Sequence, residues 1–200
     1  MSWIKVIPFE EATGKLKRLY SKVSGPNDNV DNIMLVHGLR PHTMTGHMSL
    51  YKNVLHNSNN TLPKWFLETI GVYVSLLNDC TYCIDHHFKG LQRLINDDAK
   101  ALQIKSDLEN NLMTFEDEKY NASLRYAKKL TQAASEIRKL DVQSLSDAGL
   151  TDGEVLEVNQ VTSYFNYANR TVLGLGVSTV GDIIGLSPNN SDDENNWNHQ

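Results

Sequence analysis

The sequence predicts an all-α fold. Apolar residues recur at helical spacing along most of the chain, alternation with a period of two is almost absent, and proline, glycine and asparagine residues separate helix-sized segments. With 200 residues, the chain is long enough to bury a substantial core in one domain. We therefore expect one helical domain over residues 1–186 and a disordered polar tail, rich in Asn, Asp and Ser, over residues 187–200.

The first part of the chain is expected to form four helices, over residues 9–23, 31–39, 41–55 and 63–76. Pro8, Pro41 and Pro63 stand at the starts of three of them, where proline is accepted because the amide of that position has no partner within the helix. Pro41 also ends the second helix, since proline cannot continue a helix interior.

A fifth helix is expected over residues 80–95. Asn78 can take the left-handed position after the fourth helix and Asp79 can cap the next one, which places Cys80 in its first turn. The partial positive charge at a helix N-terminus favours a thiolate over a thiol. The sequence therefore predicts that Cys80 ionises readily.

Three further helices are expected over residues 97–104, 115–138 and 151–173. Thr151 and Glu154 occupy the two positions of a capping box at the start of the last helix, and Gly174 and Gly176 are expected to close it.

Charge and hydropathy argue against two classes of partner. The formal net charge is -5, so the chain lacks the basic surface that binding to a nucleic-acid backbone requires. No run of about 18 apolar residues is present, and the N-terminus lacks the regions of a secretory signal. We therefore expect a cytoplasmic protein with neither a nucleic acid nor a membrane as partner. In that compartment a close cysteine pair is more often catalytic or metal-binding than structural.

The segment from Asp79 to His87 gathers the only two cysteines and two of the seven histidines. On a helix, Cys80, Cys83 and His87 share one stripe, and His86 stays within reach of it. Two cysteines at this spacing can close a small disulfide. Redox or metal chemistry is therefore the first hypothesis, with inert core cysteines as the simpler alternative.

Together with Glu68, these residues resemble the active-site signature of the alkylhydroperoxidase D-like (AhpD-like) branch of the carboxymuconolactone decarboxylase superfamily. The pattern Glu-x11-Cys-x2-Cys-x3-His on two consecutive helices is much more specific than a lone CxxC. Segments 40–43, 46–48 and 164–170 are similar to parts of the peroxidase-related members, so that the likeness extends over about residues 9–186.

The resemblance implies an all-α AhpD-like domain with the CxxC pair at the N-terminus of a central helix. It also implies a homo-oligomer, such as a dimer, trimer or hexamer, and a thiol-dependent reduction of hydroperoxides. By position, Cys83 would attack the peroxide and become a sulfenic acid, and Cys80 would condense with it to a disulfide. His87 would take the thiol proton and Glu68 would orient His87. No cofactor is implied, but an external dithiol would have to reduce the disulfide. A dihydrolipoyl carrier, a thioredoxin-like protein and a low-molecular-weight thiol would all meet the same disulfide, and the sequence does not decide among them.

One position departs from the family pattern. Alkylhydroperoxidase D has a histidine between its cysteines, where this chain has Tyr82, and a tyrosine with a pKa near 10 is a poor proton acceptor at neutral pH. Slower turnover, another substrate or use of His86 in the relay therefore remain open. Tyr82, His86 and His47 are the candidates for relay or pocket residues. His47 follows His42 by five residues, a poor spacing for metal ligands, so no metal site is expected there.

Two alternatives remain. A zinc-binding or structural oligomeric module would use Cys80, Cys83, His87 and one of His86 or Glu68. Structural zinc sites usually draw ligands from two segments, and the sequence has no second Cys/His pair, so our prediction contains no metal. A decarboxylase on the same scaffold is disfavoured because that branch of the superfamily does not depend on a CxxC pair.

Overall fold

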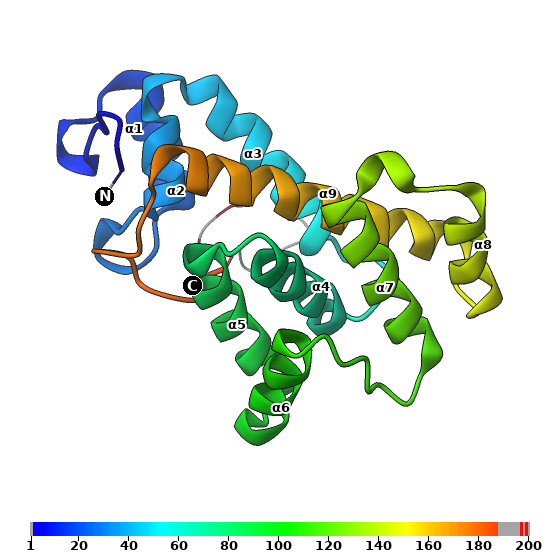
Figure 1. The fold of residues 1–200 in the computed structure, drawn as a ribbon. Helices are drawn as coiled ribbons and strands as arrows, with labels where there is room; N and C mark the ends of the chain where they lie inside the picture. The colour runs from blue at the N-terminus through cyan, green and yellow to red at the C-terminus, as the bar shows by residue number, and fades with distance from the viewer. Residues whose placement is uncertain (1, 188–196, 198, 200) are drawn as a thin grey trace.

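The computed structural model describes residues 2–187, Trp197 and His199, and these residues form helices and no β-strand (Figure 1). The all-α prediction is therefore confirmed. The α-helices are α1 (Gly14–Val23), α2 (Asn32–Leu35), α3 (Pro41–Leu55), α4 (Lys64–Leu77), α5 (Thr81–Ile95), α6 (Asp98–Glu109), α7 (Glu118–Gln132), α8 (Lys139–Asp147) and α9 (Asp152–Leu175). Short 3-10 helices lie at Phe9–Glu11, Pro26–Asp28, Val36–Leu39 and Ala134–Glu136.

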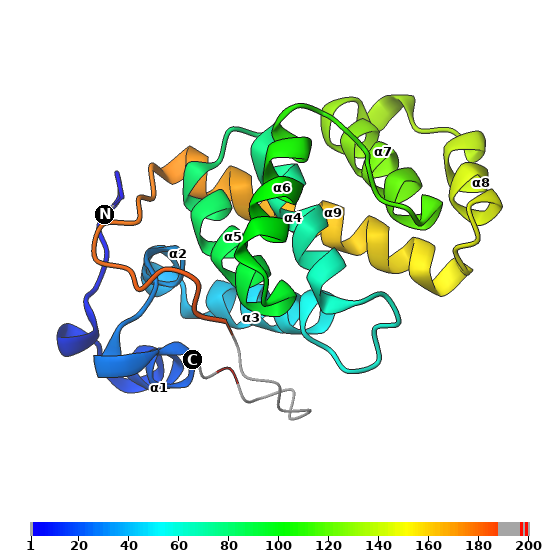
Figure 2. The same cartoon turned by 90° about the horizontal axis from the view of Figure 1, so that it is seen from below.

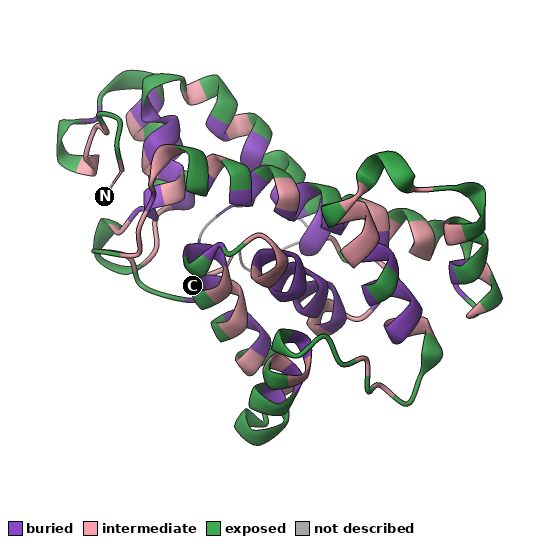
Figure 3. Cartoon of the chain, in the orientation of Figure 1, coloured by how far each residue is buried: buried purple, intermediate pink, exposed green. Residues whose placement is uncertain are grey.

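Helix α4 lies in the middle of the fold. It packs against α5, α7 and α9, and every residue from Phe66 to Ser75 is buried, as the purple helix in Figure 3 shows. A helix that is apolar on nearly all sides is expected in such a position. Close packing against α9 depends on Gly71, because a Cβ atom there would collide with the ring of Phe165. Helix α4 therefore fixes the positions of α5 and α9, which carry residues of the candidate active site described below.

The chain that follows α9 returns across α2. The predicted capping box of Thr151 and Glu154 is present at the start of α9, whereas Gly174 lies within the helix and only Gly176, with φ of 60°, closes it. The side-chain amide of Asn32 then donates hydrogen bonds to the carbonyl oxygens of Ser178 and Val180, at 2.8 and 3.0 Å. Figure 2 shows this return segment in orange, running past α2. The C-terminal part of the chain is thus held beside α2.

The helix expected over 9–23 is divided in two, which corrects the prediction. A 3-10 turn at Phe9–Glu11 is followed by two extended residues, and α1 begins only at Gly14, whose φ is 55°. The break brings the N-terminal segment back onto α1, where Tyr20 and Lys17 donate hydrogen bonds to the carbonyl oxygens of Ile7 and Phe9. These contacts with the N-terminal segment decide where α1 begins, although the helical spacing of apolar residues continues through the break.

Two helix boundaries in the second half also differ from the prediction. The segment expected as one helix over 115–138 breaks at Ala133, with φ of -146°, and a separate helix α8 follows. Asp141 on α8 accepts hydrogen bonds from the Arg138 amide and from Lys129 of α7, which ties the two helices together. Helix α6 extends beyond the expected range 97–104, to Glu109, with Asp97 as its N-cap.

Most of the polar tail, residues 188–196, 198 and 200, lies outside the described residues, so the domain boundary and the disordered tail stay predictions. Among the described tail residues, Trp197 and His199 are buried, with exposed fractions of 5% and 6%. In the described part of the chain, no helix combines the length and the apolar character needed to cross a bilayer.

Candidate active site

The cysteine pair is positioned by the tight connection between α4 and α5. Asp79 takes the left-handed conformation with φ of 54°, and Cys80 is the N-cap of α5 rather than a residue of its first turn. The expected roles are therefore displaced by one residue. Asn78 keeps φ of -98° because its side-chain amide donates to the side-chain oxygens of Asn166 and Asn169 on α9. The Cys80 amide completes the turn by donating to the carbonyl oxygen of Ser75 at 2.9 Å.

The two cysteines are reduced and their sulfur atoms are 2.7 Å apart. Both are buried: Cys80 has no exposed surface and Cys83 is 3% exposed. Cys83 lines a cavity, together with side chains from α3, α4, α9 and the C-terminal part of the chain. The pair is thus placed to form a disulfide after small movements, and Cys83 is the sulfur that a molecule in the cavity would meet.

The two thiols differ in their tendency to ionise. Burial raises the pKa of Cys83 well above its usual range, and the hydrogen bond between the sulfurs raises it further. The same hydrogen bond lowers the pKa of Cys80. Of the two thiols, Cys80 therefore ionises more readily, as the sequence predicted. The main cause of its lowered pKa is the hydrogen bond with Cys83, whereas the prediction rested on the helix N-terminus. A base must take the proton of Cys83 before that sulfur can act as a nucleophile.

Asn169 is a candidate functional residue that the spacing of the motif did not reveal. Its side chain is fully buried and makes a hydrogen bond with the Cys83 side chain that lowers the pKa of that thiol. Its amide also donates to Ser75 at 3.1 Å, and its oxygen accepts from Asn78. Because both ends of the amide are held, Asn169 presents a fixed donor to the sulfur.

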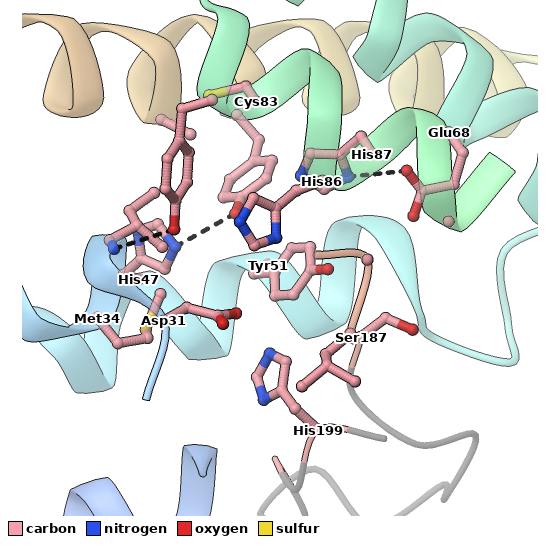
Figure 4. A pocket seen from close by; sticks show the side chains of 17 residues that line it. Asp31, Met34, His47, Tyr51, Glu68, Cys83, His86, His87, Ser187 and His199 are labelled. Atoms are coloured by element: carbon pink, nitrogen blue, oxygen red, sulfur yellow. Dashed lines mark hydrogen bonds and ion pairs between the residues drawn. The ribbon is translucent and has the colours of Figure 1, made fainter. Parts of the chain in front are cut away.

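His87 and Glu68 form a pair on the same cavity. Nδ1 of His87 lies 2.8 Å from Oε2 of Glu68, and Figure 4 marks this contact with a dashed line. Glu68 is 3% exposed and lies against Gly90. A Cβ atom added at Gly90 would be 3.7 Å from the Glu68 carboxylate, which is an ordinary contact distance. The ring of His87 packs edge-on against Phe165. A neutral His87 that donates Nδ1–H to the carboxylate presents Nε2 as a proton acceptor.

Tyr82 and His86 meet a carboxylate that is distant in sequence. The Tyr82 hydroxyl donates to Oδ2 of Asp182 at 2.7 Å and accepts from the amide of Ile33. His86 packs on the Tyr82 ring, with Nε2 at 3.3 Å from the same carboxylate oxygen. Burial and the Asp182 charge raise the pKa of Tyr82 well above its usual range. Tyr82 therefore serves here as a hydrogen-bond donor to Asp182, not as the proton acceptor that a histidine would supply.

His47 also lines the cavity, from α3. It is 3% exposed, and its Nε2 lies 3.3 Å from the hydroxyl of Tyr164. Burial lowers the pKa of His47 to about 3, so that its ring is neutral near pH 7. Among the residues that the structure describes, no group of three or more His, Cys, Asp and Glu side chains is arranged to hold a metal ion.

The cavity as a whole is small and lined by both polar and apolar side chains. Its volume is about 50 Å³. Asp31, the N-cap of α2, lines it but makes no capping hydrogen bond, and burial raises its pKa to about 7. The lining is completed by Ile33, Met34, His47, Tyr51, Glu68, Tyr82, Cys83, His86, His87, Gly90, Tyr164, Ala168, Gly185, Leu186, Ser187 and His199. All seven residues expected at the site thus line this cavity or, in the case of Cys80, contact a residue that does.

The sequence matches no protein-family model, and no curated protein matches it. Several solved structures have a similar fold. A protein from Ralstonia eutropha JMP134, described as an alkylhydroperoxidase AhpD core and an uncharacterized peroxidase-related protein, superposes with a TM-score of 0.74 at 22% identity. An uncharacterized peroxidase-related protein from Silicibacter sp. TM1040 has the same TM-score at 20% identity. In each case the match covers 88% of this chain and 91% of the other.

A third similar structure has a different activity in its description. It is the debrominase Bmp8 in complex with 2,3,4-tribromopyrrole, with a TM-score of 0.69 and 15% identity over 89% of this chain and 93% of the other. Identities at this level establish the fold and leave the reaction open. The chain has the all-α fold of the AhpD-like, peroxidase-related proteins.

Proposed function

We propose that this protein is a thiol-dependent peroxidase that reduces hydroperoxides through Cys83 and Cys80. The observation that carries the proposal is the position of the two sulfurs. They are 2.7 Å apart, and one of them lines a cavity that also holds the His87–Glu68 pair. A nucleophile, a resolving thiol and an oriented base are the groups that this reaction requires.

The reaction would proceed in three balanced steps. The Cys83 thiolate attacks one peroxide oxygen, the O–O bond breaks, and the departing alkoxide takes a proton to become an alcohol. Cys83 is then a sulfenic acid. The Cys80 thiolate attacks the sulfenic sulfur, a disulfide forms, and the hydroxyl group leaves as water after gaining a proton. An external dithiol then restores both thiols by exchange and is itself oxidised to a disulfide.

His87 would act as the base for Cys83. The buried thiol holds its proton because its pKa is raised, and His87 follows it by one helical turn on the same cavity. A water molecule or the peroxide itself would connect the two groups. Proton transfer by a placed side chain typically accelerates a reaction by roughly 10²–10⁴-fold. Glu68 would stabilise the imidazolium that forms.

The reductant and the assembly are also part of the proposal. A lipoyl carrier or a thioredoxin-like protein would supply the dithiol, the chain would act as a homo-oligomer, and its location would be cytoplasmic. The exchange would begin at the Cys83 sulfur, because Cys80 has no exposed surface.

Reductive debromination is a second candidate, favoured by the similarity to the debrominase. The same thiol pair could supply the two electrons: an aryl bromide and two thiols would give the arene, hydrogen bromide and a disulfide. Incubation of the reduced protein with 2,3,4-tribromopyrrole, followed by measurement of released bromide and remaining thiols, distinguishes the two reactions.

The decisive experiment for the peroxidase is the intact mass of the reduced protein before and after one equivalent of hydroperoxide, with the thiols then counted by alkylation. We expect the wild-type chain to lose two hydrogens and Cys80→Ser to gain one oxygen. Unchanged masses with both thiols still free would reject the proposal.

A further inference from the structure

One part of the cavity is lined by three polar side chains that each leave one buried atom without a hydrogen bond. Asp31 comes from the start of α2, His86 from α5 and His199 from the C-terminal part of the chain. Their exposed fractions are 8%, 8% and 6%. Each has a buried atom without a hydrogen bond: Oδ1 of Asp31, Nε2 of His86 and Nδ1 of His199. In Figure 4 the Asp31 carboxyl lies between the two rings, on the side of the view away from Cys83.

The missing hydrogen bonds are unusual for this site. Buried polar groups are nearly always paired, because desolvation without a partner is unfavourable. Nearby groups follow that rule: Glu68 is paired with His87, and Tyr82 with Asp182. His86 does lie 3.3 Å from Asp182, but not in hydrogen-bonding geometry. Together with Nδ1 of His47, which also lacks a hydrogen bond, these exceptions from separate segments on one cavity indicate a place where a bound group completes the hydrogen bonding.

The charges of the cavity restrict what that group can be. Asp31 and Glu68 supply carboxyl groups, and no lysine or arginine is found among the described lining residues. His47 and His199 are neutral near pH 7, since burial lowers their pKa values to about 3 and about 4. An anionic group would therefore meet repulsion without a compensating cation. The small volume, about 50 Å³, further favours a compact ligand.

We propose that Asp31, His86 and His199 form a polar subsite that binds a hydroxyl group of a small, uncharged substrate. A hydroxyl both donates and accepts, so it can donate to Oδ1 of Asp31 and accept from an imidazole N–H. The assignment of a hydroperoxide as the other end of that substrate, at Cys83, rests on the function proposed above. The subsite itself is defined by its unpartnered atoms.

Binding to a catalytically inactive protein tests the subsite without any reaction. The probes are 2-methylpropane-1,2-diol, tert-butanol, which lacks the second hydroxyl, and 2-hydroxyisobutyrate, which is anionic. NMR titration of Cys83→Ala is expected to show the diol binding at least about fivefold more tightly than either other probe, the value of one or two hydrogen bonds. Asp31→Leu in this background should remove the preference, whereas Asp85→Leu, an exposed position on α5, should keep it. Equal affinities for the three probes would overturn the proposal.

Kinetics then test the subsite in the reaction. We expect a lower KM for 2-hydroperoxy-2-methylpropan-1-ol than for tert-butyl hydroperoxide, with similar kcat, and a ratio of KM values that approaches one in Asp31→Leu. His199→Ala, near the chain end, should reduce the same ratio if Asp31→Leu does not fold. If neither hydroperoxide is reduced but the diol preference persists, the peroxidase proposal fails and the subsite stands. If both are reduced with equal KM, the peroxidase stands and the subsite is wrong.

Discussion

The two sides of the cavity are built differently. On one side, Cys83, His87 and Glu68 come from the consecutive helices α4 and α5, and each is held by a partner. On the other side, Asp31, His86 and His199 come from segments far apart in the chain and leave polar atoms unpaired. Groups that must react in a fixed geometry benefit from being held in advance, whereas groups that recognise a ligand remain free until it arrives. Under the two proposals above, the first side would carry the reaction and the second would recognise the substrate, and they are called the reacting side and the recognising side below.

The largest expected effect is on the reacting side. Cys83→Ser should reduce the rate of hydroperoxide reduction by at least about a thousandfold, because the hydroxyl is a far weaker nucleophile at neutral pH. Stopped-flow measurement of peroxide consumption checks this. Cys80→Ser should still consume one equivalent of peroxide in a single turnover. Equal activity of the two variants and wild type would remove the cysteines from the mechanism.

His87→Ala is expected to slow the first turnover by about a hundredfold at pH 7, the usual size of a general-base contribution. The loss should shrink as the pH rises, since the raised pKa of Cys83 means that hydroxide forms the thiolate without help only under alkaline conditions. A pH series of single-turnover rates measures the effect. A loss that is the same at all pH values would show that His87 has only a packing role against Phe165.

Asn169→Ala should have a smaller effect, a decrease of about tenfold at pH 7, because one hydrogen bond to a thiolate stabilises it by roughly 1.5 kcal/mol. The decisive reading is the pH dependence of Cys83 alkylation in the Cys80→Ser background, which should move to higher pH. Asn159→Ala is the matched control, since Asn159 lies on the same helix and donates to Tyr126 instead. An unmoved alkylation profile would contradict a direct role of the amide.

The last predicted effect is on stability, and it has opposite signs on the two sides. The folded-state pKa of Asp31 is raised to about 7, so the folded protein favours the protonated acid and its stability falls as the pH rises from about 4 to 7. Asp31→Asn should remove that dependence and raise the free energy of unfolding at pH 8 by about 2 kcal/mol. Glu68→Gln should lower it by about 1 kcal/mol, since the charged partner of His87 is lost.

Urea unfolding at pH 5 and pH 8 measures both variants. Destabilisation by Asp31→Asn at pH 8 would mean that Asp31 already has a partner, and the contrast between the two sides would disappear.

The reacting side was predictable from the sequence because its spacing is local. Helical periodicity places Cys80, Cys83 and His87 on one stripe of α5, whereas Glu68, on the preceding helix, was named through the resemblance to the AhpD-like motif. Asp182 was missed because it meets Tyr82 across 100 residues, and no local pattern records such a contact. Helix α8 was missed for the opposite reason, since helical spacing continues through a break that only the backbone at Ala133 reveals.

The assignment of the α4–α5 turn was wrong by one residue because Asn and Asp both tolerate the left-handed conformation. What decided between them was the Asn78 side chain, which is held by Asn166 and Asn169 of α9. Contacts with a third helix thus settled a choice that propensity left equal.

That three-residue connection from Asn78 to Cys80 also sets how the chain can change over time. A single inserted residue would turn α5 by about 100° relative to α4, so that Cys83 and His87 would leave the cavity together. Most loops tolerate insertions and deletions, but the length of this connection must stay constant for Cys83 and His87 to face the cavity. Among variants of this chain, those that keep the chemistry are expected to differ in residue type at the turn and to preserve its length.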